Sequence, residues 1–132
     1  MRLLVDSHAV IWAVDDPAKP SSDAAKALED PANELLVSAG TIWEVSIKSG
    51  LKKLSLSMPF RQWMNKAMAD LGLTLLPINV EYADVQAALP RHHADPFDGL
   101  IAAQAKVENV SLVSADVIFD QYGVTRIWNS VP

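Results

Sequence analysis

Four acidic residues are spaced through the chain at positions where an apolar segment gives way to a helix or a loop. They are Asp6, Glu44, Asp98 and Asp116. In an open parallel sheet the carboxyl ends of the strands lie along one edge, so such residues can converge on one site. Converging carboxylates need a cation, and Mg²⁺ or Mn²⁺ prefers carboxylate and water oxygen. The pattern predicts phosphoryl transfer or phosphodiester hydrolysis at a divalent-metal site.

The first and last acids follow predicted strands. Asp6 directly follows the apolar run 2–5, which leads into a helical pattern over 7–13. Asp116 follows the β-rich run 110–114. Both acids are therefore expected at the carboxyl edge of the same sheet.

The second acid is predicted about one turn into a helix. A strand over 34–38 is followed by Ala-Gly, and Thr41 is placed to cap a helix that continues to residue 48. Glu44 lies on that helix, close to the strand end.

The third acid is predicted in the first turn of another helix. Pro96 suits the first helical position, and Asp95 is placed as its N-cap. Asp98 then lies at the positive end of this helix. Asp95 is interpreted mainly as a cap, with a supporting role in the metal site as the alternative.

The remaining segments alternate between helical and strand patterns. Further helices are expected over 23–30, 60–71 and 80–89, with a strand over 73–77. This order predicts an α/β fold, a three-layer α/β/α arrangement with a mostly parallel central sheet. A length of 132 residues, half of them apolar, predicts one domain spanning 1–132.

The expected compartment is inferred from three features that the sequence lacks: cysteine, a signal peptide and a membrane-spanning stretch. There is no cysteine, which excludes disulfides and permits a reducing compartment. Asp6 interrupts the N-terminal apolar run too early for a signal peptide, and no stretch is long enough for a membrane span. A cytoplasmic protein without membrane association is expected.

The motifs around the acids resemble those of PIN-domain ribonucleases, specifically VapC-type toxins of toxin–antitoxin systems. The resemblance rests on segments 3–8, 38–44, 95–98, 100–105 and 114–116. It implies a PIN-like fold and an Mg²⁺-dependent (or Mn²⁺-dependent) endoribonuclease that cleaves RNA. It also implies a homodimer and a cognate antitoxin protein as partner. By the same resemblance, the catalytic and metal-binding residues are Asp6, Glu44, Asp98 and Asp116, with Ser7 and Ser114 as hydroxyls beside them.

One position departs from the pattern of the resembled subgroup. An arginine often follows the third acid there, whereas this chain has Gly99. A catalytically silent PIN-like interaction module therefore stays open as an alternative. A receiver-type phosphoacceptor domain lacks support because no mid-chain strand ends in an acceptor aspartate. An aspartyl phosphatase would need a second acid two residues after Asp6, where His8 stands.

Charge and aromatic content leave further choices open. The formal charge of −5 is unusual for a protein that binds nucleic acid, but three lysines beyond the Glu44 helix could hold a phosphate backbone: Lys48, Lys52 and Lys53. His92 and His93 lack the further ligands of a zinc site. With Arg91 they could instead touch RNA, but a plain surface loop is the preferred interpretation of this segment. His8 is interpreted as structural. Aromatic and Met side chains are expected in the core, with any exposed subset marking a partner groove: Trp12, Trp43, Phe60, Trp63, Met64 and Met68.

Overall fold

Five parallel strands form the central sheet of the protein, whose computed structural model describes residues 1–90 and 95–129. The strand order is β3-β2-β1-β4-β5, and each neighbouring pair is parallel. The strands are β1 (Arg2–Val5), β2 (Glu34–Ser38), β3 (Leu73–Leu76), β4 (Ser111–Val113) and β5 (Arg126–Ile127). The predicted α/β class with a parallel sheet is confirmed.

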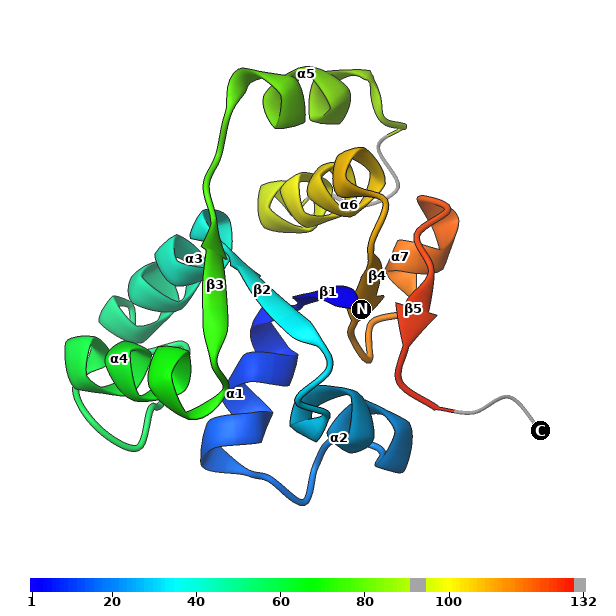
Figure 1. Cartoon of the computed structure of the whole chain (residues 1–132). Coiled ribbons are helices and arrows are strands. Elements are labelled where there is room, and N and C mark those ends of the chain that lie inside the picture. The colour runs from blue at the N-terminus through cyan, green and yellow to red at the C-terminus, as the bar shows by residue number, and fades with distance from the viewer. Residues whose placement is uncertain (91–94, 130–132) are drawn as a thin grey trace.

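Helices cover both faces of this sheet (Figure 1). They are α1 (Ser7–Asp15), α2 (Ser22–Glu29), α3 (Ala39–Gly50), α4 (Phe60–Asp70), α5 (Val80–Ala88), α6 (Pro96–Glu108) and α7 (Ile118–Gln121). Side chains from α1, α2 and α4 pack on one face, and those from α5, α6 and α7 pack on the other. The three-layer arrangement follows from this division.

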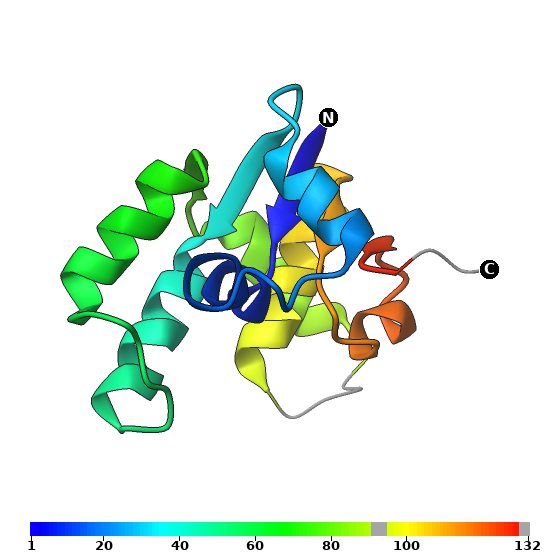
Figure 2. The ribbon, with the colours of Figure 1, turned by 90° about the horizontal axis from the view of Figure 1, so that it is seen from below.

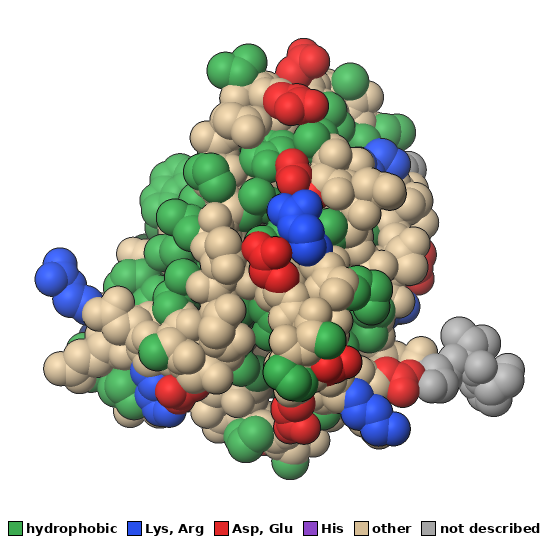
Figure 3. All heavy atoms as spheres, in the orientation of Figure 1, with side chains coloured by type: hydrophobic (Ala, Val, Ile, Leu, Met, Phe, Trp, Pro, Cys, Tyr) green, Lys and Arg blue, Asp and Glu red, His purple; other side chains and the backbone are tan. Residues whose placement is uncertain are grey.

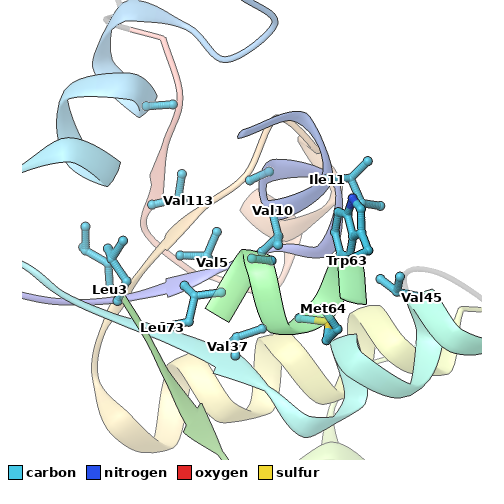
Figure 4. Packing of buried hydrophobic residues seen from close by; sticks show 14 residues of the cluster. Leu3, Val5, Val10, Ile11, Val37, Val45, Trp63, Met64, Leu73 and Val113 are labelled. Atoms are coloured by element: carbon cyan, nitrogen blue, oxygen red, sulfur yellow. The ribbon is translucent and has the colours of Figure 1, made fainter. Parts of the chain in front are cut away.

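The two faces of β1 show how the sequence creates the layers. Leu3 and Val5 belong to one core cluster and Leu4 to the other, as the two-residue period of a strand requires. All three are fully buried. Figure 4 shows Trp63 of α4 among the side chains of the first cluster. A sheet buried on both faces needs continuous apolar strands, which this chain supplies.

Strand register brings the ends of β1, β2 and β4 to one edge. Val5 is paired with Val113, so Asp6 and Ser114 each stand one residue beyond that pair. Figure 2 shows the arrowheads of β1 and β2 pointing towards the side from which α1 and α3 begin. The expected convergence of strand ends is therefore present in the backbone.

Details of the element boundaries differ from the prediction. Helix α3 begins at Ala39 with Ser38 as its N-cap, whose hydroxyl oxygen accepts a hydrogen bond from the Gly40 amide at 3.0 Å. Thr41 is thus in the first turn and is not the cap, because the last residue of β2 already supplies a capping hydroxyl. Helix α7 and strand β5 were not predicted. Within the described residues, no helix is both long and apolar enough to cross a membrane.

Candidate active site

Asp6 is held at the junction of β1 and α1. It is the N-cap of α1, and its Oδ1 accepts a hydrogen bond from the Ser7 amide at 2.7 Å. Its Oδ2 accepts a hydrogen bond from the Ser114 hydroxyl at 2.7 Å. Burial raises the pKa of Asp6, and the hydrogen bonds from Ser114 and Ser7 lower it by less. A buried acid fixed through both oxygens has a defined position at the sheet edge.

Glu44 projects from the second turn of α3 and is also buried, with 5% of its surface exposed. The Ser7 hydroxyl donates to its Oε1 at 2.6 Å and lies 3.1 Å from the Thr41 hydroxyl. Lys48, one turn further along α3, donates from Nζ to Glu44 Oε2 at 2.5 Å. Glu44 is thus held between a hydroxyl and an ammonium group.

Asp98 lies in the first turn of α6, and burial and neighbouring acids affect its ionisation. The helix begins as predicted, with Pro96 in the first turn and Asp95 as N-cap accepting from the Phe97 amide at 2.9 Å. Partial burial, and to a smaller extent the negative charges of Asp95, Asp6, Asp116 and Glu44 in that order, together raise the pKa of Asp98 from 3.8 to about 7. Burial is thus the main cause of this raised pKa, and each of the other three predicted acids adds to it.

Asp116 is the most exposed of the four acids. It follows β4 by three residues, and its amide donates to the Ser114 hydroxyl oxygen at 3.0 Å. Its Oδ1 accepts from the Ile118 amide at 3.0 Å. Ser114 therefore links Asp116 to Asp6, because its oxygen accepts from one residue while its hydroxyl donates to the other.

The carboxylates are electrostatically coupled, but they are not arranged as a finished coordination sphere. Among the described residues, no three acidic or histidine side chains are placed so that they could hold a metal ion. The hydrogen bonds explain this geometry: Asp6 is bonded to two serines, Glu44 to Ser7 and Lys48, and Asp116 to a backbone amide. Asp6, Glu44 and Asp116 are thus each turned towards a local donor. A cation would have to exchange some of these contacts, most directly the ammonium of Lys48.

The acids also affect the pKa of Lys48, a residue that the sequence suggested only as part of a basic patch that could hold a phosphate backbone or be plain solvated surface. Partial burial lowers its pKa, but the hydrogen bond to Glu44 and the negative charges of Glu44, Asp95 and Asp98 outweigh this and raise the pKa. The spacing of four residues on α3 was the available signal for the pair. Thr41 was recognised only as a cap, and its place beside Ser7 was missed.

The departure at Gly99 has a packing explanation. A Cβ at this position would lie 2.7 Å from Nε2 of Gln86, and that atom donates to the Pro96 carbonyl at 2.9 Å. The end of the Gln86 side chain on α5 thus lies against Gly99, and a longer residue at position 99 would require that side chain to move. The segment with Arg91, His92 and His93 lies outside the described residues.

The predicted aromatic core is only partly correct. Trp63 and Met64 are buried, but Trp43 on α3 is 62% exposed, with its ring edge-on to Phe97 at 5.8 Å between ring centroids. Ile47 and Leu51 follow on the same face of α3 and are exposed too. Apolar side chains gather on the left of Figure 3, where α3 and β3 lie in Figure 1. We refer to Trp43, Ile47 and the C-cap residue Leu51 as the α3 face, since they are large apolar side chains exposed at spacings of four residues.

Comparison with protein families gives one match over most of the chain. The model of the PIN domain matches residues 3–124. A curated relative, Ribonuclease VapC22 from Mycobacterium tuberculosis, is 31% identical over 115 residues, which is 86% of each chain.

Solved structures with the same fold include chains from toxin–antitoxin complexes. A chain of VapBC2 from Rickettsia felis, crystallised with a DNA fragment from their promoter, has a TM-score of 0.71 at 18% identity, covering 98% of this chain and 100% of that one. A chain of VapBC-1 from nontypeable Haemophilus influenzae has a TM-score of 0.65 at 17% identity, covering 96% of both. At these identities the likeness establishes the shared fold.

Proposed function

The chain belongs to the PIN-domain family, and we propose that it is a metal-dependent endoribonuclease that acts as the toxin of a toxin–antitoxin pair. The proposed enzyme is a single PIN-like domain over residues 1–132. The observation that carries the proposal is that two serines bring three of the acids together: Ser7 is hydrogen-bonded to Asp6 and Glu44, and Ser114 is hydrogen-bonded to Asp6 and Asp116. These acids come from separate elements of the fold, and acids that served only as helix caps would not need to lie close to one another.

The donor set fits Mg²⁺ or Mn²⁺, since both prefer carboxylate oxygen and keep several waters. In the proposed site, Asp6, Glu44 and Asp98 hold the cation directly or through water, and Asp116 completes the site or orients the attacking water. The chemistry that a bound cation would supply is acidification of a water for in-line attack on phosphorus and neutralisation of charge on the leaving oxygen. No side chain has to form a covalent intermediate.

The supporting residues have roles that follow from their contacts. Ser114 orients Asp6 through its hydroxyl and also accepts from the Asp116 amide, so it couples two of the acids. Ser7 orients Glu44. Asp95 caps α6 and adds negative charge beside Asp98, which supports a cation without requiring Asp95 to touch it.

The partners proposed for this enzyme are a cognate antitoxin and a second copy of the chain. The curated relative is named a VapC ribonuclease, and several structures with this fold are toxin–antitoxin complexes. The exposed α3 face supports self-association, because burying Trp43, Ile47 and Leu51 removes large apolar side chains from water. The proposed site of action is the cytoplasm, where RNA and antitoxin are available.

RNA cleavage by the purified protein tests the proposal. Cleavage of a mixed single-stranded RNA is expected with Mg²⁺ or Mn²⁺ and not with chelator, and Asp6→Asn should abolish it without unfolding the protein. Asp70→Asn on α4 is the matched control, because Asp70 is an exposed acid paired with Lys66 and should leave cleavage unchanged. A folded wild-type protein that cuts no RNA with either metal would favour the silent interaction module.

A further inference from the structure

A small pocket lies directly against the acidic site. It has a volume of about 190 Å³ and includes Ser7 and Glu44 in its lining, so it shares a wall with the proposed metal site. Ile11 and Leu54 supply apolar surface, and Lys48 and Lys53 supply positive charge. This volume is below the usual range for a drug-sized ligand. It suits one unit of a polymer whose remainder stays outside.

Lys53 is the cation of this pocket that is available to a ligand. Lys48 is engaged by Glu44, whereas Lys53 forms no ion pair with any residue that the structure describes. Its side chain is exposed. In a chain with a net charge of −5, a solvent-accessible ammonium in the same pocket as Glu44 marks where a polyanion can approach.

The turn after α3 fixes the position of Lys53. Lys52 has a left-handed backbone with φ of 58°, a conformation unfavourable for residues other than glycine. The amides of Lys53 and Leu54 both donate to the Lys48 carbonyl, at 2.9 and 3.2 Å. This closed turn holds Lys53 and Leu54 against Lys48. A left-handed residue directly after the C-cap is a common way to end a helix, and here it gives two pocket residues a defined position.

We propose that this pocket is a nucleotide subsite, which binds the RNA unit next to the scissile phosphodiester. Lys53 binds a backbone phosphate, and the base or ribose of that unit packs against Ile11 and Leu54. The inference rests on the proposed ribonuclease function, which it extends to how the substrate is held. RNA is favoured over an acidic peptide because the pocket combines apolar walls with a cation and adjoins acids suited to phosphodiester chemistry.

Two measurements on Lys53→Gln test the subsite, with Lys26→Gln as the matched control. Lys26 is an exposed lysine on α2 outside the pocket. In chelator, the affinity of a short labelled single-stranded RNA should fall for Lys53→Gln, and the slope of log affinity against log salt should decrease in magnitude by about 0.7. With Mg²⁺, the KM for RNA cleavage should rise while kcat changes little. Lys53→Glu should raise KM further.

The outcomes separate the subsite from the function on which it rests. Wild-type protein that neither binds nor cleaves RNA would overturn the proposed function and the subsite with it. Cleavage with equal KM and equal salt slope for the Lys53 and Lys26 variants would overturn the subsite alone. Loss of antitoxin binding by Lys53→Gln, with unchanged RNA binding and KM, would assign the pocket to a peptide carboxylate and also overturn it. Circular dichroism of each variant checks that it is folded.

Discussion

Asp98→Asn should stabilise the metal-free protein at alkaline pH. The folded-state pKa of Asp98 is raised from 3.8 to about 7, so between these values the folded state binds more protons than the unfolded state. The stability that protonated Asp98 contributes is fully present below pH 4 and is lost as pH rises through 7. Asparagine is uncharged at all of these pH values. The Asp98→Asn variant therefore lacks the free-energy cost of an ionised side chain at this position.

The size of the effect follows from the pKa and the exposure of Asp98. The full rise in the pKa of Asp98 corresponds to roughly 4 kcal/mol in the free energy of unfolding. Solvent screening of this partly exposed side chain reduces the figure to about 2 kcal/mol. Loss of a first-turn acid from α6 opposes it by about 0.5 kcal/mol. A net gain near 1.5 kcal/mol should raise the Tm by roughly 6 °C for a domain of this size.

Thermal melting at pH 5 and pH 8, in chelator and in Mg²⁺, measures this prediction. The variant should melt above wild type in chelator at pH 8, with a smaller difference at pH 5. Mg²⁺ should stabilise wild type by binding the folded state, and stabilise the variant less. Asp23→Asn, which removes a first-turn acid from α2, should only lower the Tm slightly. An Asp98→Asn protein that is destabilised in chelator and responds normally to Mg²⁺ would show that Asp98 is a structural helix-start acid.

Three further variants test the packing and hydrogen bonds around the site by urea unfolding. Gly40→Ala should cost about 1–3 kcal/mol, because its Cβ would lie 2.4 Å from Leu100 Cδ2, whereas Gly50→Ala meets open space and should not destabilise. Lys52→Gly should gain about 1 kcal/mol by relieving the left-handed backbone; a loss would mean that the turn is unstrained. Ser114→Ala should cost about 1–3 kcal/mol, since buried Asp6 loses a donor, and a neutral result would remove Ser114 from this role.

The positions of the acids along the chain were predictable because backbone patterns determine them. Asp6 ends an apolar strand, and the register of β1 with β4 then places it level with Ser114. Asp95 and Pro96 begin α6 as the cap and first-turn preferences require, which places Asp98 in the first turn. The family resemblance agreed with these patterns, and family membership and fold are both confirmed.

The hydrogen-bond partners of the side chains were harder to predict from the sequence, because several neighbouring groups could bond to the same side chain. Glu44 is bonded to Ser7 and Lys48, and no pattern in the sequence decides between these donors and a metal. Ser38 and Thr41 could each cap α3, and the earlier residue does so because it stands at the end of β2. The space at Gly99 is filled by Gln86 from another helix, a tertiary contact without a local signal.

Binding of Mn²⁺ to the four acid variants tests most directly whether the carboxylates form one site. Titration calorimetry on Asp6→Asn, Glu44→Gln, Asp98→Asn and Asp116→Asn should show weaker Mn²⁺ binding for each, while the Asp70→Asn control binds as wild type does. Because each variant removes a charged oxygen donor from a shared site, the losses should be strongly non-additive in double variants. Unchanged Mn²⁺ affinity in the folded Asp6 and Asp98 variants would contradict the shared site.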